Sequence, residues 1–397
     1  MITDPVGLGI PSGRIPLPVF PLEEFNTQFT LPVEQYQSAW SLPPNLYNNA
    51  EVYKAACQMF KQNWVAAGLT SDVALPGQYF TVNIAGEPVA VLRGEDGTLI
   101  AFSNVCRHRA KLILTELKGE LDGPLKCMYH GWEYDPDTGY PNRVPRLGAV
   151  KELSGEKFSR EKHGLVPFEV DTWGPLVFVR MKKGKDSLPL STILAPLAEQ
   201  TKEMDLLSWQ WGGRKEYIMN CGWIEYNGNF LDGGNHVETV HPELASSLDL
   251  TRYNTEVFDY CSLQSCPTKD EKSSATDVRQ GTKAMYWWAF PNVMVNIYKS
   301  ATDRKSAMDT NIVLPLGPDK CKVIFDFFFD KGWDQSSICT YINDADKTQL
   351  QDMKVCEELT PGLMSEFAQR GPYEKPEIGE YHFHQLLARQ LQAARDK

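Results

Sequence analysis

Short segments in which apolar and polar residues alternate follow one another through the first half of the chain. Before them, Tyr53–Ala67 has the pattern of a helix, and we expect one helix there. The alternating segments predict short strands, because successive side chains of a strand point to opposite faces. They cover Gly77–Ile84, Val89–Arg93, Leu99–Phe102, Leu125–Met128 and Pro175–Met181. We therefore expect a small all-β domain in this part of the chain.

The second half has longer apolar runs and helical segments. Ala284–Tyr298, Thr310–Leu316 and Lys320–Phe329 predict strands of an antiparallel sheet, and Thr348–Glu358 has apolar residues at helical spacing. A further helix is expected at the C-terminus. The predicted fold class is α+β, in three parts. These are an extended Pro- and Gly-rich arm (residues 1–44), an all-β domain (residues 45–185) and a domain with an antiparallel sheet (residues 186–397).

Two short segments of the all-β part each carry one cysteine and one histidine, as Cys106-x-His108 and Cys127-x-x-His130. In a Rieske [2Fe–2S] cluster two thiolates hold one iron and two imidazoles hold the other, so two such loops can clamp both irons. A zinc site is the alternative, but zinc modules more often take a cysteine pair from a single loop. Gly131 gives the second loop the conformational freedom that a tight turn beside a cluster needs.

A second group of candidate ligands lies about a hundred residues later, in Asp232-x-x-x-His236-x-x-x-x-His241. Two neutral imidazoles and one carboxylate can hold Fe(II) on one face and leave positions open for O2 and substrate. Gly233 and Gly234 would interrupt a helix and bring the backbone close to the metal. The chain has seven histidines, and four of them fall in the two motifs, which argues against chance placement.

These motifs carry a family resemblance. The segments CRH and KCMYHGWEYD resemble the Rieske domain of ring-hydroxylating oxygenases, and NFLDGGNHVETVHPELASSL resembles the mononuclear iron motif of the same enzymes. The segments Met308–Asp330 and EYHFHQLLARQL are similar to choline monooxygenase and its quaternary-ammonium relatives. The resemblance runs from about Leu42 to the C-terminus. It implies an N-terminal all-β Rieske domain and a C-terminal, helix-grip-like catalytic domain.

The resemblance also implies the third iron ligand. In the family this carboxylate lies late in the chain on a helix, and Asp352 in the segment TQLQDMKVCEE takes that place. Its position beside the apolar face of the predicted helix is compatible with an inward side chain. Asp344 and Asp346 are nearby competitors, and a solvated aspartate is the plainer interpretation.

A carboxylate that bridges the two metal centres is a further family feature. It commonly lies three positions before the first histidine ligand, where this chain has Gly233. Asp232, one residue earlier, is our candidate, and Glu238 and Glu225 are alternatives. The aromatic residue that commonly precedes the first histidine is replaced by Asn235, which leaves the substrate open.

The activity implied is that of a monooxygenase with a [2Fe–2S] cluster, mononuclear Fe(II) and O2 as co-substrate. A ferredoxin or a flavin-dependent reductase would supply electrons, and the enzyme would be a homotrimer. The implied substrate is a small quaternary or methylated ammonium compound, oxidised as choline is or N-demethylated. An aromatic or alkaloid-like substrate is the enzymatic alternative, and an iron–sulfur electron-transfer protein is the non-enzymatic one.

Aromatic residues gather on the predicted strands of the second domain. Most of them should be core, but two or three converging on the iron could hold an ammonium group by cation–π attraction. They are Tyr286, Trp287, Trp288, Phe290, Tyr298, Phe327, Phe328 and Phe329.

Charge and cysteine content limit the partners and the compartment. The formal net charge of −11 argues against nucleic acid. Basic residues outnumber acidic ones between Arg107 and Lys126, which is either a solvated face or a docking site for an acidic ferredoxin.

No apolar run approaches the roughly 18 residues of a membrane span. The nine cysteines show no regular disulfide spacing, so we expect an intracellular, soluble protein. The cytoplasm, or the plastid stroma after removal of a transit segment, is the expected compartment.

Overall fold

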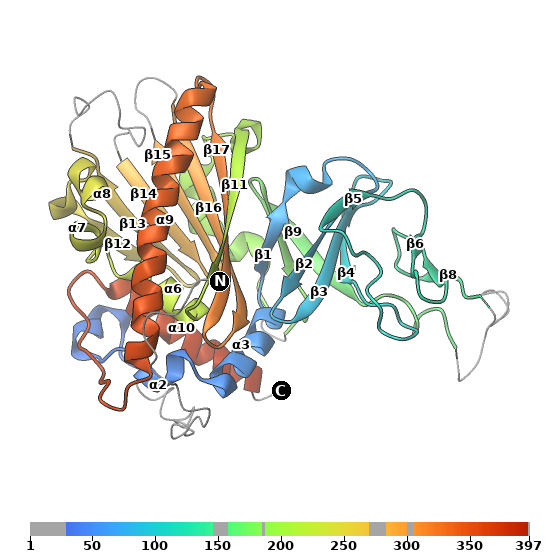
Figure 1. The fold of residues 1–397 in the computed structure, drawn as a ribbon, viewed down its shortest axis with the longest axis horizontal. Coiled ribbons are helices and arrows are strands. Elements are labelled where there is room, and N and C mark those ends of the chain that lie inside the picture. The colour runs from blue at the N-terminus through green and yellow to red at the C-terminus, as the bar shows by residue number, and fades with distance from the viewer. Residues whose placement is uncertain (1–28, 146–157, 185–186, 270–282, 300–304, 396–397) are drawn as a thin grey trace, which may run out of the picture.

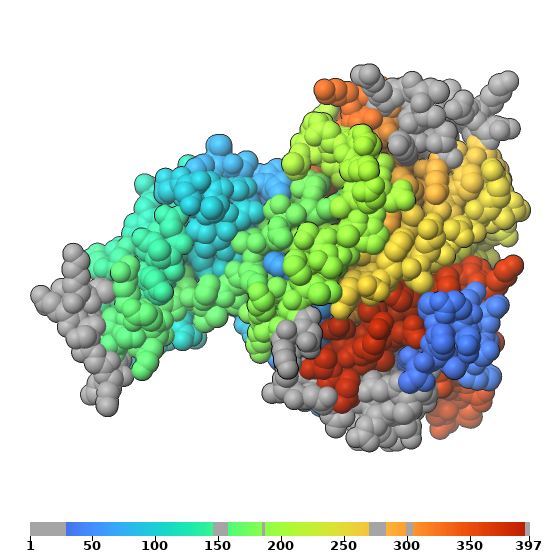
Figure 2. Space-filling view, turned by 180° about the vertical axis from the view of Figure 1, so that it is seen from behind, coloured from blue at the N-terminus to red at the C-terminus, as the bar shows by residue number. Residues whose placement is uncertain are grey.

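The computed structural model describes residues 29–145, 158–184, 187–269, 283–299 and 305–395. The first 28 residues of the expected N-terminal arm lie outside this range. A larger half with a wide sheet lies beside a smaller β-rich half (Figure 1). The view from behind shows the smaller half projecting away from the larger one (Figure 2).

The smaller half is all-β, as expected. Its main sheet has the strand order β1-β10-β9-β4-β3-β2-β5, and every described pairing in it is antiparallel. The strands are β1 (Val65–Leu69), β2 (Gln78–Ile84), β3 (Glu87–Arg93), β4 (Leu99–Ser103), β5 (Lys118–Glu120), β9 (Pro167–Trp173) and β10 (Leu176–Arg180). A second sheet of three strands lies at the far end of this half (Figure 1). It consists of β6 (Leu125–Lys126), β7 (Glu133–Tyr134) and β8 (Pro141–Arg143).

The helix expected over Tyr53–Ala67 is placed wrongly at both ends. Helix α3 (Ala50–Gln62) begins earlier because the Asn49 side chain accepts hydrogen bonds from the amides of the first turn. It ends at Gln62 because the next residues form β1, which is buried throughout and pairs with β10. Sheet pairing that cannot be read from the local pattern therefore decides this boundary. Helix α3 packs against the C-terminal helix α10 (Ile378–Arg395) of the larger half.

The larger half contains one seven-stranded antiparallel sheet in the order β11-β17-β16-β15-β14-β13-β12. The strands are β11 (Gln210–Met219), β12 (Asn254–Val257), β13 (Cys261–Pro267), β14 (Lys283–Ala289), β15 (Val293–Lys299), β16 (Ala307–Gly317) and β17 (Lys320–Phe329). The single strand expected over Ala284–Tyr298 is wrong, because β14 and β15 form a hairpin. Pro291 lies in the turn between them, where its missing N–H removes no hydrogen bond between the two strands.

Helices surround this sheet. The 29-residue helix α9 (Gln335–Leu363) runs along the sheet (Figure 1), and Tyr341 on α9 packs edge-on against Phe329 of β17. The expected helix over Thr348–Glu358 is thus the middle of a longer one. The other helical segments are α2 (Pro44–Tyr47), α4 (Leu190–Ile193), α5 (Ala195–Thr201), α6 (Trp223–Leu231), α7 (Val237–Val240), α8 (Pro242–Ser247) and the 3-10 turns η1 (Val33–Ser38), η2 (Thr70–Val73), η4 (Leu206–Ser208) and η5 (Leu250–Arg252). Within the described residues, the structure contains no helix with the length and apolar character that a bilayer crossing requires.

Candidate functional site

The two Cys–His segments of the smaller half form loops with the same backbone geometry. In each loop the cysteine N–H donates to the carbonyl five residues on, from Cys106 to Lys111 and from Cys127 to Trp132. In each, the residue four positions after the cysteine donates back to the cysteine carbonyl. That residue has a positive φ in both loops, +56° at Ala110 and +74° at Gly131. The turn at Gly131 was expected from the sequence, but the matching turn at Ala110 was missed because alanine rarely adopts this conformation.

The loops bring the four predicted cluster residues together. Cys106 and Cys127 are buried at 2% exposure each, while His108 and His130 lie nearer the surface with ring centroids 4.5 Å apart. Among the described residues, the buried Nδ1 atom of His130 has no hydrogen-bond partner. Buried polar atoms normally have a partner, so this ring nitrogen is available as a metal ligand. The donor set therefore fits a Rieske [2Fe–2S] cluster, with its thiolates inside and its imidazoles near the surface.

Aromatic residues of the same half support these loops. The Tyr134 hydroxyl lies 3.2 Å from the Cys106 sulfur and accepts a hydrogen bond of 3.0 Å from the Arg107 amide. The Trp132 ring stacks on His108, with centroids 5.1 Å apart and planes 3° from parallel. Burial lowers the pKa of His108, and the nearby His130 and Arg109 lower it further, which favours the neutral imidazole that can bind a metal.

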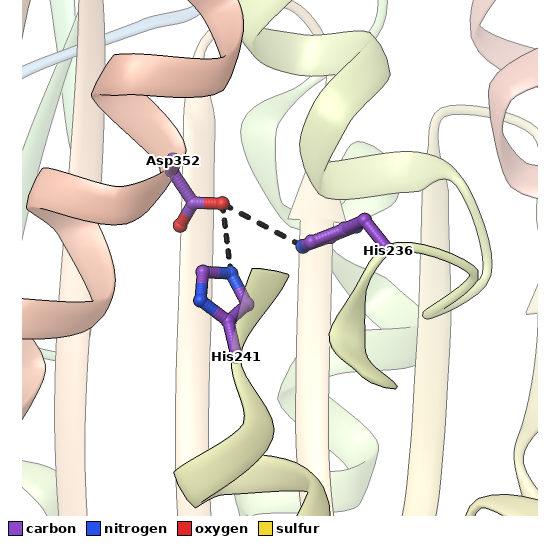
Figure 3. Close-up of side chains that lie close together, drawn as sticks. All are labelled: His236, His241 and Asp352. Carbon is purple, nitrogen blue, oxygen red and sulfur yellow. Dashed lines mark hydrogen bonds and ion pairs between the residues drawn. The ribbon is translucent and has the colours of Figure 1, made fainter. Parts of the chain in front are cut away.

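The second candidate site lies in the larger half. His236 is in the turn between α6 and α7, His241 joins α7 to α8, and Asp352 projects from the middle of α9 (Figure 3). Gly233 and Gly234 have φ values of +71° and +79°, and a Cβ on Gly233 would clash with the Pro376 carbonyl. These two glycines end α6 and turn the chain so that His236 faces Asp352.

Three ligand atoms converge in this site. The Asp352 Oδ1 atom lies 2.9 Å from Nε2 of His241 and 3.5 Å from Nε2 of His236 (Figure 3). All three atoms lie within 4.8 Å of one another, and among the described residues no other group of three such ligands does. Two imidazoles and one carboxylate from one side match the donor set of a non-haem iron centre.

The other ring nitrogens are held by neighbouring side chains. His236 donates from Nδ1 to the Asp232 carboxylate at 2.6 Å, and His241 from Nδ1 to the Gln351 carbonyl oxygen at 2.7 Å. Each bond fixes the tautomer that leaves Nε2 as the metal-binding lone pair. Asn229 of α6 donates to Asp352 Oδ1 at 2.9 Å and orients the carboxylate. Neither Gln351 nor Asn229 was expected from the sequence, because nothing in their local pattern marks them.

Asp232 accepts three hydrogen bonds. Its Oδ2 atom takes the His236 ring N–H and the His236 backbone N–H, and its Oδ1 atom takes the Gly234 amide at 2.9 Å. Burial alone would lower the pKa of His236, but the hydrogen bond and charge of Asp232, together with the charge of Asp352, raise it overall. Asp232 therefore serves as the electrostatic partner of His236 within its own chain.

The other candidates for the third iron ligand and for the bridging carboxylate have different surroundings. Asp346 accepts a hydrogen bond of 2.5 Å from the Tyr217 hydroxyl and pairs with Lys215, while Asp344 pairs with Lys347. Glu238 is exposed on α7. Glu225 is buried at the start of α6, where it accepts the Gly222 amide, and burial followed by the Cys221 charge raises its pKa to about 8.

A cavity of about 110 Å³ opens beside the three ligands. Of the aromatic residues named from the sequence, Tyr286 and Tyr298 line it, while the others are core. Phe325 lines it too and was not named. Three polar residues of β15 and β16 that were not predicted as lining residues also lie in the wall. These are Asn296, Asp309 and Asn311.

The two sites occupy opposite ends of the molecule. The loops around β6–β8 lie at the far tip of the smaller half, and α7, α8 and α9 lie in the larger half on the other side (Figure 1). An electron that passes from the first site to the second within one subunit would have to cross from one end of the molecule to the other.

A Rieske-type pair of loops on an all-β domain, joined to a helix-covered antiparallel sheet with a two-histidine, one-carboxylate centre, defines an oxygenase of the Rieske non-haem iron class. Residues 63–154 match the Rieske [2Fe–2S] domain model, and residues 206–393 match the catalytic domain model of the ring-hydroxylating alpha subunit. The chain is 33% identical to chloroplastic choline monooxygenase of Arabidopsis thaliana, over 84% of this chain and 78% of that protein. It is 32% identical to the glycine betaine monooxygenase oxygenase subunit of Chromohalobacter salexigens, over 51% of this chain and 43% of that one.

Solved structures agree on the fold. A quaternary ammonium Rieske monooxygenase in complex with L-carnitine superposes with a TM-score of 0.74 at 21% identity, covering 91% of this chain and 99% of that one. Naphthalene 1,2-dioxygenase from Rhodococcus superposes with a TM-score of 0.71 at 16% identity, covering 93% of this chain and 98% of that one.

The chain belongs to the Rieske non-haem iron oxygenase family, and it is a monooxygenase of that family. Enzymes of this family carry a Rieske [2Fe–2S] cluster and a mononuclear iron, use O2 and need an electron donor. The fold class expected from the sequence is confirmed, and so is the expected cofactor set.

Proposed function

We propose that this enzyme hydroxylates a C–H bond beside the nitrogen or oxygen of a small quaternary or methylated ammonium compound. The observation that carries the proposal is the cavity of about 110 Å³ beside His236, His241 and Asp352, with Tyr286 and Tyr298 in its wall. A cavity of roughly 150 Å³ holds one benzene molecule, so this space suits a substrate of a similar number of atoms. Polycyclic aromatic or alkaloid substrates are larger than that.

Each residue has a definite task in this proposal. Cys106, Cys127, His108 and His130 hold the cluster, and His236, His241 and Asp352 hold the Fe(II). The iron, when bound, supplies O2 binding and activation. Asp232 and Gln351 keep the two imidazoles in the metal-binding tautomer. Tyr286 and Tyr298 meet as a corner, with rings 5.9 Å apart and 80° between their planes, and can face an ammonium group.

The outcome depends on which carbon is oxidised. Oxidation of a carbinol carbon, with O2, two electrons and two protons, gives an aldehyde hydrate and water. Oxidation of an N-methyl group gives a hemiaminal that releases formaldehyde. The relatives include enzymes named for choline and for glycine betaine.

We propose a homotrimer with electron transfer between subunits. The support is the separation of the two sites within one chain, and the carboxylate of Asp232 that holds His236 at the edge of the iron site. Asp232 would face the cluster histidines of the neighbouring subunit. Co-assembly of Cys106→Ala with His236→Ala tests this, because active mixed oligomers require transfer between chains. Full activity in a strictly monomeric preparation would refute it.

The electron donor is proposed to be a ferredoxin or a flavin-dependent reductase. Arg107 and Arg109 are exposed on the first cluster loop, where an acidic donor could dock. For the compartment we propose a plastid stroma or the cytoplasm. The choline monooxygenases among the relatives are chloroplastic.

The function is tested by single-turnover assays of the reduced protein under 18O2. Choline, carnitine, betaines and aromatic acids are compared, and both labelled product and formaldehyde are measured. Turnover of an ammonium compound with one 18O atom incorporated supports the proposal. Turnover of an aromatic acid in place of every ammonium compound overturns it.

A further inference from the structure

Tyr253 is held against the turn that carries His236. It follows the 3-10 turn η5 and precedes β12, and its backbone N–H donates to the Leu250 carbonyl at 3.2 Å. Its ring packs on Gly234, where an added Cβ would lie 2.8 Å from one ring carbon and 3.0 Å from Cζ, the carbon that carries the hydroxyl. Gly234, with a φ of +79°, therefore leaves room for this ring two residues before His236. Tyr253 also lines the cavity beside the three candidate iron ligands.

The Tyr253 hydroxyl differs from the other tyrosine hydroxyls of the cavity lining. The Tyr226 hydroxyl donates to Gln349 at 2.8 Å, and the Tyr298 hydroxyl donates to the Tyr286 hydroxyl at 3.3 Å. The Tyr253 hydroxyl makes no hydrogen bond to any residue that the structure describes. An enclosed tyrosine hydroxyl usually has a partner, so an unused one in the wall of a ligand cavity indicates that the ligand supplies the partner.

The hydroxyl is available as a donor. Burial, followed by the charge of the nearby Asp232, raises the pKa of Tyr253 well above its ordinary value of 10.0, and Cys266 and Tyr298 act in the same direction. The phenol therefore keeps its proton, and a protonated phenol can donate one hydrogen bond. The same cavity of about 110 Å³ contains the corner of Tyr286 and Tyr298. One small molecule that fills this space can contact both the corner and the Tyr253 hydroxyl.

We propose that Tyr253 is a specificity-determining residue whose hydroxyl donates a hydrogen bond to an oxygen atom of the substrate. The proposal rests on the proposed function and narrows it to ammonium compounds that also carry an alcohol or carboxylate oxygen. A quaternary ammonium group has no lone pair, so it cannot accept this bond itself. The ammonium group lies against Tyr286 and Tyr298, and the oxygen lies at Tyr253.

The test compares ligand affinities by isothermal titration calorimetry on the holoenzyme, without a reductant and under anaerobic conditions so that no turnover occurs. The probes are choline, glycine betaine and n-propyltrimethylammonium, in which a methyl group replaces the choline hydroxyl. For the native enzyme we expect at least one of the two oxygen compounds to bind about 3- to 10-fold more tightly than the propyl compound. One buried hydrogen bond between neutral groups supplies a factor of this size.

The variant Tyr253→Phe keeps the ring against Gly234 and removes only the hydroxyl. We expect the Kd of choline to rise about 3- to 10-fold if an alcohol is the acceptor. If a carboxylate is the acceptor, we expect the Kd of glycine betaine to rise about tenfold or more, because a charged acceptor makes the stronger bond. The Kd of n-propyltrimethylammonium should change less than about twofold.

The matched control is Tyr260→Phe. Tyr260 lies in the turn between β12 and β13 of the same half and does not line the cavity, so this change should leave all three Kd values as they are. The cluster absorption and thermal unfolding report whether both variants are folded.

The outcomes separate two failures. If Tyr253→Phe changes the Kd of the propyl compound as much as that of the oxygen compounds, or changes none of them, the role of Tyr253 is refuted while turnover of an ammonium compound still supports the proposed function. A native enzyme that binds the propyl compound as tightly as both oxygen compounds refutes this role without any variant. If no ammonium compound binds or is turned over, the proposed function fails, and the role of Tyr253 fails with it.

Discussion

Asp232 offers the sharpest test of how the iron site is built. The variant Asp232→Asn removes the negative charge and replaces one acceptor oxygen with an NH2 group. Of the three hydrogen bonds that Asp232 accepts, the two on Oδ2 come from the ring and the backbone of His236, and the third comes from Gly234. An amide has one acceptor atom, so it cannot satisfy both sets of donors.

The expected loss follows from the position of Asp232 behind His236, a proposed metal ligand. Loss of such a partner costs about 10- to 100-fold in metal affinity or activity. We therefore expect the Kd of the mononuclear site for Fe(II) to rise by about 10- to 100-fold, which corresponds to about 1.4 to 2.7 kcal/mol. If Asp232 also bridges the two centres, product formation at saturating iron should remain slow.

The assay is anaerobic Fe(II) titration of protein from which the mononuclear iron has been removed, followed by product measurement at saturating iron. The Rieske absorption should be unchanged, because the cluster lies in the other half of the chain. Glu238→Gln is the matched control, because Glu238 is exposed on α7 and this change removes the same charge from a side chain that faces solvent. An Asp232→Asn variant with native iron affinity and native turnover would refute both the orienting role and the bridge.

The remaining predictions concern the other ligands and one buried acid. Asp352→Ala should lose mononuclear iron and turnover with the cluster spectrum intact, whereas Asp346→Ala should keep both; metal analysis showing the reverse would mean that the wrong carboxylate was chosen. Cys106→Ala should abolish the cluster absorption and leave mononuclear iron bound, and a native Rieske spectrum in this variant would rule out the cluster assignment. Glu225→Gln should raise the thermal stability relative to the native protein, increasingly as pH rises. The pKa of Glu225 is raised from 4.5 to about 8 in the folded protein, so its stabilising contribution is present below the unfolded pKa and is lost as pH rises towards 8. The free energy of unfolding of the variant should exceed that of the native protein by at most about 5 kcal/mol at high pH. Thermal unfolding of both proteins between pH 5 and pH 8.5 measures this difference in stability. A stability difference that does not change with pH would contradict the raised pKa of Glu225.

Residue types and their spacing are enough to predict the chemistry of the two proposed metal sites. Cysteine and histidine are rare, and their spacing is specific, so Cys106, His108, Cys127 and His130 can be grouped from the sequence alone. The pair His236 and His241 is recognisable for the same reason. The α+β class also follows from local patterns, because alternating and helical periodicities depend on neighbouring residues alone.

Other features depend on contacts between distant parts of the chain, which no local pattern contains. Strand β1 ends α3 because it pairs with β10, more than a hundred residues later. Asp352 meets the histidines because α9 runs along the sheet and carries it there, and only the family resemblance could separate it from Asp346 in the sequence. The cavity wall, with Asp309 beside Asn296, exists only through strand register, since neither residue differs locally from any polar residue in a strand. Local pattern fixes which residues can do chemistry, and long-range packing decides which of them meet.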